Sequence, residues 1–86
     1  MTEQNLRKFL SRGTALYYKY KNNGQAGMVN IWFYKDRFII SWEECKDGDQ
    51  FNESSYTRDD LNDFSNIDSV IDYLNNSNIP VELFEA

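Results

Sequence analysis

No histidine occurs in the sequence, and cysteine and proline occur once each among its 86 residues. Histidine is the commonest general acid or base near neutral pH and the commonest metal ligand, so its absence excludes Ser–His and Cys–His nucleophilic pairs. A zinc site needs several Cys or His side chains, which Cys45 alone does not supply. We therefore expect no enzyme activity, no metal and no cofactor.

Carboxylates are the remaining candidates for chemistry. Glu43 and Glu53 are expected to face each other across a hairpin, where two carboxylates can act as an acid–base couple, but nothing in the sequence builds a pocket around them. Asp47 to Asp49 are too few for a calcium-binding loop and are typical of a hairpin turn. The four glycines are scattered over turns and form no phosphate-binding motif.

Long apolar runs are also missing. The longest, Ile31–Tyr34 and Phe38–Ile40, are far shorter than a membrane-spanning segment, and the first residues lack the basic and apolar regions of a signal peptide. A lone cysteine forms no internal disulfide, which suits a reducing compartment. These absences predict a cytoplasmic protein outside the membrane.

The residues that are present support a single domain over residues 1–86. Apolar residues make up 41% of the chain and aromatic residues 16%. Each enclosed aromatic side chain buries about 150–250 Å². A core can therefore form in spite of the short length.

The sequence predicts the element order α–β–β–β–β–α. Thr2 is a candidate N-cap for a first helix that ends near Gly13. Three strands follow at 16–21, 25–34 and 38–45, joined by turns at 22–24 and 35–37. A weaker fourth strand is expected around Phe51–Tyr56, followed by a capped turn at 57–60.

A second helix is expected after Ser65, which is a candidate cap, and its apolar stripe runs from Ile67 to Leu74. Pro80 prevents its continuation, and residues 79–84 form either a short edge strand or a tail packed on the sheet. The fold class is α+β: a four-stranded antiparallel meander with N- and C-terminal helices on one face.

Two narrow helices cover only one side of such a sheet, yet large side chains occur on both sides of its strands. Either Trp32 and Tyr34 or Phe33 and Val29 face away from the helices, because a one-residue change of register exchanges the two sets. The uncovered face then carries aromatic side chains of the kind that anchor protein interfaces.

Charge is divided unevenly along the chain. Residues 1–41 carry seven basic and two acidic side chains, whereas residues 42–86 carry two basic and twelve acidic ones. Clustered acids resemble the phosphates that a basic groove binds, and opposite charge speeds association. Together with the aromatic face they predict a surface for a basic protein partner. The candidate partner-binding residues are Trp32, Trp42, Glu43, Glu44, Asp47, Asp49, Glu53, Asp59, Asp60 and Asp63.

In size, acidity, lack of catalytic residues and aromatic-rich α+β layout, the chain resembles the small immunity proteins paired with contact-dependent-inhibition or colicin-type nuclease toxins. The resemblance implies a cytoplasmic protein of bacterial competition that binds its toxin's catalytic domain and blocks the active site or substrate groove. Phage inhibitors of host nucleases are similar in the same respects.

A single-stranded nucleic-acid-binding module is the alternative interpretation. Strands 16–21 and 32–37 interleave aromatic and basic residues, as a stacking platform for bases does. The net charge of −5 and the lack of an RNP-type glycine–aromatic signature count against this alternative.

Overall fold

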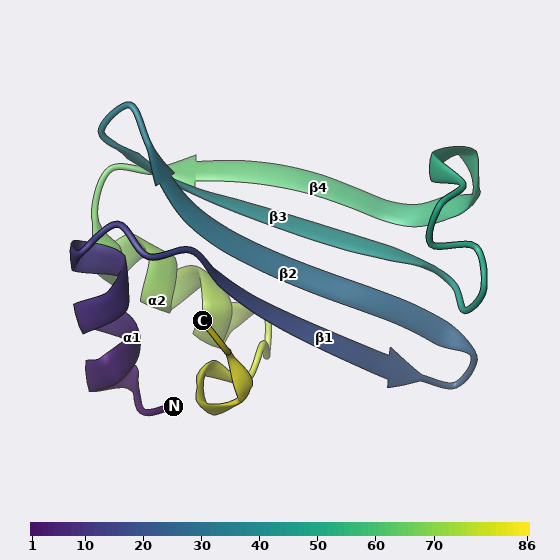
Figure 1. Ribbon diagram of the computed structural model, residues 1–86, viewed down its shortest axis with the longest axis horizontal. Helices are drawn as coiled ribbons and strands as arrows, with labels where there is room; N and C mark the ends of the chain where they lie inside the picture. Colours follow the sequence, from purple (N-terminus) through teal and green to yellow (C-terminus); the bar gives the residue numbers. More distant parts are fainter.

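A computed structural model describes residues 1–86, which form one four-stranded sheet and two helices (Figure 1). The strands are β1 (Leu16–Asn22), β2 (Gln25–Tyr34), β3 (Arg37–Lys46) and β4 (Tyr56–Phe64), in that order across the sheet and antiparallel throughout. Helix α1 (Glu3–Ser11) precedes the sheet and α2 (Ile67–Asn76) follows it, and both lie on the same face. The predicted α+β meander is confirmed.

The first two hairpins turn where the sequence predicts, but each turn has two residues rather than three, because Asn22 and Arg37 belong to the strands. Asn23 and Gly24 have φ of 52° and 80°, and Lys35 and Asp36 have φ of 49° and 62°. Positive φ at both central residues gives a turn whose twist matches that of the strands. The long ladder between β2 and β3 follows directly from the second of these turns.

The fourth strand lies further along the chain than predicted. The chain passes through a short 3₁₀ helix, η1 (Glu53–Ser55), and β4 occupies the segment that was predicted to be a turn at 57–60. Both sides of this outer strand are largely accessible, so its sequence lacks the apolar alternation that identifies a half-buried strand. As a result Glu43 lies opposite Asp59, and the predicted pairing of Glu43 with Glu53 is wrong.

Asn66 is the N-cap of α2, one residue later than the predicted cap at Ser65. Its side-chain oxygen accepts a hydrogen bond from the backbone N–H of Ser69 at 2.8 Å. Thr2 caps α1 as predicted, since its hydroxyl oxygen accepts from the backbone N–H of Asn5 at 3.1 Å. Each cap satisfies a donor that a helix N-terminus leaves free.

The core fills the space between the two helices and one face of the sheet. Val29, Ile31 and Ile40 of the sheet have no exposed surface. The helices contribute their buried apolar stripes, which consist of Leu6, Leu10, Val70, Ile71 and Leu74. The sheet face under the two helices is therefore buried in the core, and the opposite face is accessible to solvent or a ligand.

The C-terminal tail closes this core. Ile79 and Phe84 are buried on either side of the short 3₁₀ helix η2 (Val81–Leu83). Glu85 then exchanges two backbone hydrogen bonds with Tyr17, at 2.9 and 2.8 Å. The tail therefore packs against the core and also pairs with β1 at one position. None of the helices has the length and apolar character needed to cross a membrane.

Candidate functional site

The open face is the side of the sheet that carries no helix. Trp32 and Tyr34 project from it, because Val29 and Ile31 on the same strand point into the core. Phe33 projects to the helix side, where its ring packs against Phe38. The sequence analysis left two alternatives for the uncovered face, and the structure shows that Trp32 and Tyr34 lie on it.

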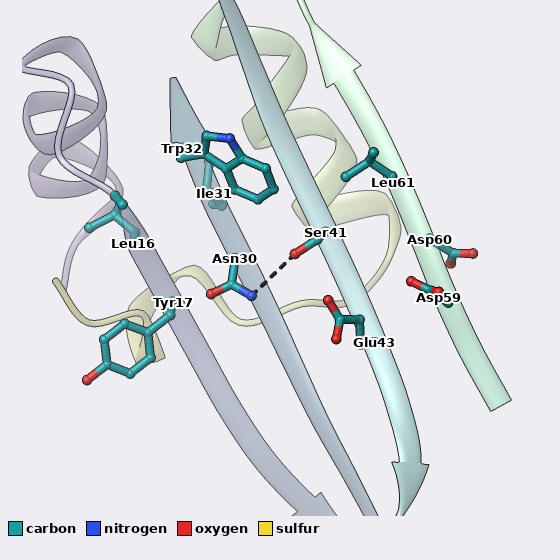
Figure 2. A pocket seen from close by; sticks show the side chains of 11 residues that line it. Leu16, Tyr17, Asn30, Ile31, Trp32, Ser41, Glu43, Asp59, Asp60 and Leu61 are labelled. Carbon is teal, nitrogen blue, oxygen red and sulfur yellow. Dashed lines mark hydrogen bonds between the residues drawn. The ribbon is translucent and has the colours of Figure 1, made fainter. Parts of the chain in front are cut away.

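A shallow hollow of about 540 Å³ occupies the middle of the open face (Figure 2). Trp32 of β2 and Leu61 of β4 lie over it, and Leu61 is 69% exposed. In its floor, the Asn30 side-chain amide donates to the buried Ser41 hydroxyl at 3.2 Å. The rest of the lining combines apolar side chains, Trp32 and Leu61 among them, with acidic residues.

Two carboxylates stand at one end of the hollow without a cation. Glu43 lies directly opposite Asp59 on the neighbouring strand, and neither is part of an ion pair (Figure 2). Like charges that face each other across a strand pair are destabilising. The open face therefore combines exposed apolar side chains with an uncompensated acidic pair.

The ten candidate residues fall into three groups. The structure places four on the open face: Trp32, Glu43, Asp59 and Asp63. Three project from the helix side of the sheet: Trp42, Glu44 and Asp60. The remaining three lie in the connection between β3 and β4: Asp47, Asp49 and Glu53. Trp32, Glu43 and Asp59 of the first group line the hollow together with Asp60, whereas Asp63 lies outside its lining.

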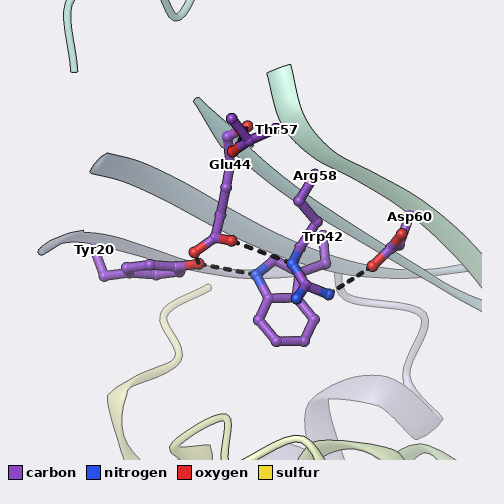
Figure 3. Close-up of polar contacts among 6 residues, drawn as sticks. All are labelled: Tyr20, Trp42, Glu44, Thr57, Arg58 and Asp60. Atoms are coloured by element: carbon purple, nitrogen blue, oxygen red, sulfur yellow. Dashed lines mark hydrogen bonds and ion pairs between the residues drawn. The ribbon is translucent and has the colours of Figure 1, made fainter. Parts of the chain in front are cut away.

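Trp42, Glu44 and Asp60 belong to a polar network on the helix side of the sheet, where Trp42 packs against the core (Figure 3). The Tyr20 hydroxyl donates to Glu44 at 2.6 Å and accepts from the Trp42 indole N–H at 2.9 Å. Arg58 forms ion pairs with Glu44 at 3.2 Å and Asp60 at 2.7 Å, and its guanidinium carbon lies 3.9 Å from the centre of the Trp42 ring. Burial, reinforced by Glu44, raises the pKa of Tyr20 to about 12.

Asp47 orders the connection between β3 and β4. The side-chain amide of Gln50 donates to its carboxylate at 3.0 Å and lowers the pKa of Asp47, an effect that Lys21 reinforces at 3.5 Å. Asp49 and Glu53 lie in the same connection and form no ion pair. These acids sit beyond the hollow, on the far end of the sheet.

The basic residues of the alternative interpretation are only partly available. Lys19, Lys21 and Arg37 share the open face with Tyr17 and Trp32. Arg37 and Lys21 each form an ion pair with an acidic side chain, at 3.1 and 3.5 Å. The Lys19 ammonium lies 5.9 Å from the centre of the Tyr17 ring. The Lys35 ammonium lies 5.3 Å from the centre of the Tyr34 ring and also has no acidic partner, so two cations remain unpaired on this face beside the carboxylates of Glu43 and Asp59.

Cys45 lies at the floor of a second hollow, of about 910 Å³, beside the connection between β3 and β4. Burial raises the pKa of the Cys45 thiol, and nearby carboxylates add to the effect. A protonated thiol is a poor nucleophile. No three His, Cys, Asp or Glu side chains gather closely enough to hold a metal ion.

Leu61 and Arg58 are the residues of these surfaces that the sequence interpretation missed. Both fall in the segment taken for a turn or in its continuation. A signal was present for Leu61, since it is the one apolar side chain between Asp59 and Asp63 and shares their period-two spacing. Side chains at this spacing lie on one face of a strand.

Comparison of the chain with protein-family models, with curated proteins and with solved structures finds no match. The arrangement of side chains on the open face is therefore the basis for a functional proposal.

Proposed function

We propose that this chain is a small acidic protein-binding inhibitor that uses its open face to bind a basic protein partner. The observation that carries the proposal is the uncompensated pair of Glu43 and Asp59 beside the half-buried side chain of Trp32 and the exposed side chain of Leu61. A lysine or arginine that enters between the carboxylates removes their repulsion. Apolar neighbours of that cation then cover the indole and the leucine, as anchor residues do in interfaces.

The biological form of the proposal is an immunity protein of bacterial competition. Such a protein acts in the cytoplasm and occupies the active site or substrate groove of a basic toxin or nuclease domain. The charge of the open face supports this role, because a groove that binds nucleic acid is lined with Lys and Arg and attracts clustered carboxylates. The net charge of −5 acts in the same direction at longer range.

Charge on the open face also favours a protein partner over single-stranded nucleic acid. The stacking residues Tyr17 and Trp32 are present, but Glu43 and Asp59 would repel the phosphates of a strand laid across them. Lys19, and Lys35 over the Tyr34 ring, are the cations on that face without an acidic partner.

Truncation of the indole tests the proposal. Trp32→Ala should weaken binding of the partner captured from the native host by about 2 kcal/mol or more, mainly through faster dissociation. Inhibition of the partner's activity should fall in step. Surface plasmon resonance gives the two rate constants, and a titration of the partner's activity gives the inhibition.

Leu83→Ala is the matched control, because Leu83 is 56% exposed on η2 and lies off the open face. It should leave binding and inhibition unchanged. Equal losses for Leu83→Ala and Trp32→Ala would contradict the proposal. RNA or DNA binding that requires Lys19 and Lys21 would replace it with the nucleic-acid module.

A further inference from the structure

The outer edge of β4 has no pairing partner. β4 is the last strand of the sheet, and the backbone hydrogen bonds outside the ladders involve none of residues 57–64 (Figure 1). The opposite edge differs, because Glu85 pairs with Tyr17 on β1. An unpaired edge presents a row of N–H and C=O groups to any chain that can lie alongside it.

The register shows which backbone groups point outward. Tyr17 exchanges its two backbone bonds with Glu85, so its N–H and C=O point away from β2. Along an antiparallel pair of strands, hydrogen-bonded and non-hydrogen-bonded residue pairs alternate. Asn30, which lies opposite Tyr17 without hydrogen bonds to it, therefore points its backbone N–H and C=O toward β3. Ser41 returns those bonds, and Leu61, which lies opposite Ser41, is left with its N–H and C=O pointing outward.

The same alternation directs the backbone groups of Asp59 and Asp63 outward as well. The side chains of Asp59 and Leu61 project from the open face (Figure 2), and the register places Asp63 on the same face. The edge therefore presents acidic, apolar and acidic side chains at two-residue spacing, together with its free backbone groups. Asp59 has no cationic partner, and Asp63 is paired with Arg37 at 3.1 Å. The most favourable partner strand places basic side chains opposite Asp59 and Asp63 and an apolar side chain opposite Leu61.

A second copy of the chain is a poor occupant for this edge. Antiparallel pairing of two β4 strands centred on Leu61 places Asp59 of each copy opposite Asp63 of the other. Like charges in directly opposed positions destabilise a strand pair. The acids thus disfavour self-association along the edge, while they favour a segment of opposite charge.

We propose that the outer edge of β4 binds an extended basic segment of a partner protein as a fifth strand. The inference deepens the function proposed above, because it rests on a basic protein partner and assigns part of its recognition to the backbone. Main-chain hydrogen bonds supply the pairing, and the alternating side chains of Asp59, Leu61 and Asp63 select basic residues two positions either side of an apolar one.

Hydrogen exchange of the protein with a designed peptide tests the inference. The probe is a capped seven-residue peptide with the core Lys-Thr-Val-Thr-Lys, and the control has Glu in place of both Lys residues. The Lys peptide should slow exchange of the Asp59, Leu61 and Asp63 amides and leave that of Lys19 unchanged. It should bind about tenfold or more tightly than the Glu peptide, because two cross-strand charge contacts change sign.

Leu61→Pro and Leu61→Ala form a matched pair of variants. Both remove the leucine side chain, but only proline removes the outward N–H, at a position where an edge strand tolerates it. Leu61→Pro should bind the Lys peptide about tenfold more weakly than Leu61→Ala. Exchange protection of Asp60 and Asn62, which pair with β3, reports whether each variant keeps its ladder.

Equal binding of the Lys and Glu peptides to the wild-type chain would overturn the inference, as would protection confined to residues outside β4. Both measurements use the wild-type chain and remain decisive if the proline variant does not fold. Dimerisation through β4 would also overturn it. If the edge fails these tests while Trp32→Ala still weakens partner binding, the proposed function stands without this mode of recognition.

Discussion

Gly27 is the residue on which the Tyr20 network depends. It lies directly opposite Tyr20, and a Cβ atom at this position would stand 2.0 Å from the Tyr20 Cζ atom. Any larger side chain must therefore displace the ring. The hydroxyl then loses its contacts with Glu44 and Trp42, and the indole N–H is left without its acceptor.

Gly27→Ala should reduce the free energy of unfolding by about 1–3 kcal/mol, since two hydrogen bonds are lost. In a Tyr20→Ala background the same substitution should cost nothing, because the ring is gone and alanine suits a strand interior better than glycine. Denaturant titrations of the four proteins measure the difference as a double-mutant cycle. Additive effects of the two substitutions would contradict the packing of the ring over Gly27.

The alkaline titration of Tyr20 gives a second measurement on the same proteins. Its pKa of about 12 exceeds the ordinary value of about 10, so the folded state binds this proton more tightly than the unfolded state. The stability it contributes is complete below about pH 10 and disappears as the pH rises through 12. When the absorbance spectrum is followed against pH, Gly27→Ala should show no tyrosine that titrates near pH 12.

At the scale of the elements, the N-cap of α2 can be tested by comparing two adjacent residues, Asn66 and Ser65. Asn66→Ala should lower the free energy of unfolding by about 0.5–2 kcal/mol, because the Ser69 N–H loses its acceptor. Ser65→Ala should change it by less than about 0.5 kcal/mol, since Ser65 is exposed and bonds to no helical N–H. Thermal or urea unfolding compares the two. A larger cost at Ser65 would mean that α2 begins one residue earlier.

The elements differ in how far local sequence determines them. β1, β2 and β3 were predictable because an Asn-Gly turn joins the first hairpin, Lys35-Asp36 joins the second, and apolar residues alternate along the strands. β4 was not, because Asp59 and Asp60 are typical of turns and the strand forms by pairing with β3. That information is nonlocal and does not appear in the composition of residues 56–64.

The same limit applies to the candidate surface. Trp32, Glu43, Asp59 and Asp63 share a face, but nearby candidates such as Glu44 and Asp60 project from the opposite one. Adjacent strand residues point to opposite sides, so a run of acids in sequence divides into two surfaces in the fold. Charge and composition led us to expect an acidic, aromatic surface, but the strand register decides which of the candidate residues lie on the same face.

At the scale of the whole molecule, the fold mixes charges that the sequence keeps apart. Three ion pairs join the basic first half of the chain to its acidic second half: Arg7–Asp68, Lys21–Asp47 and Arg37–Asp63. Exposed pairs of this kind contribute only about 0–1 kcal/mol each. Their larger effect is on the electrostatic field, because they place basic side chains beside three of the acids and leave Glu43 and Asp59 as an unpaired acidic pair on the open face.

The position of these charges, rather than the net charge, should control association. Glu43→Gln with Asp59→Asn and, as a control, Asp72→Asn with Glu82→Gln each remove two negative charges, but only the first pair lies on the open face. The open-face variant should gain about 0.2–1 kcal/mol of stability from relieved repulsion. It should also bind the basic partner about three- to tenfold more slowly at low salt, with a weaker dependence on salt. The control should differ little from wild type in both measurements. Equal slowing of both variants in stopped-flow experiments would assign the steering to net charge and remove the open face from the encounter.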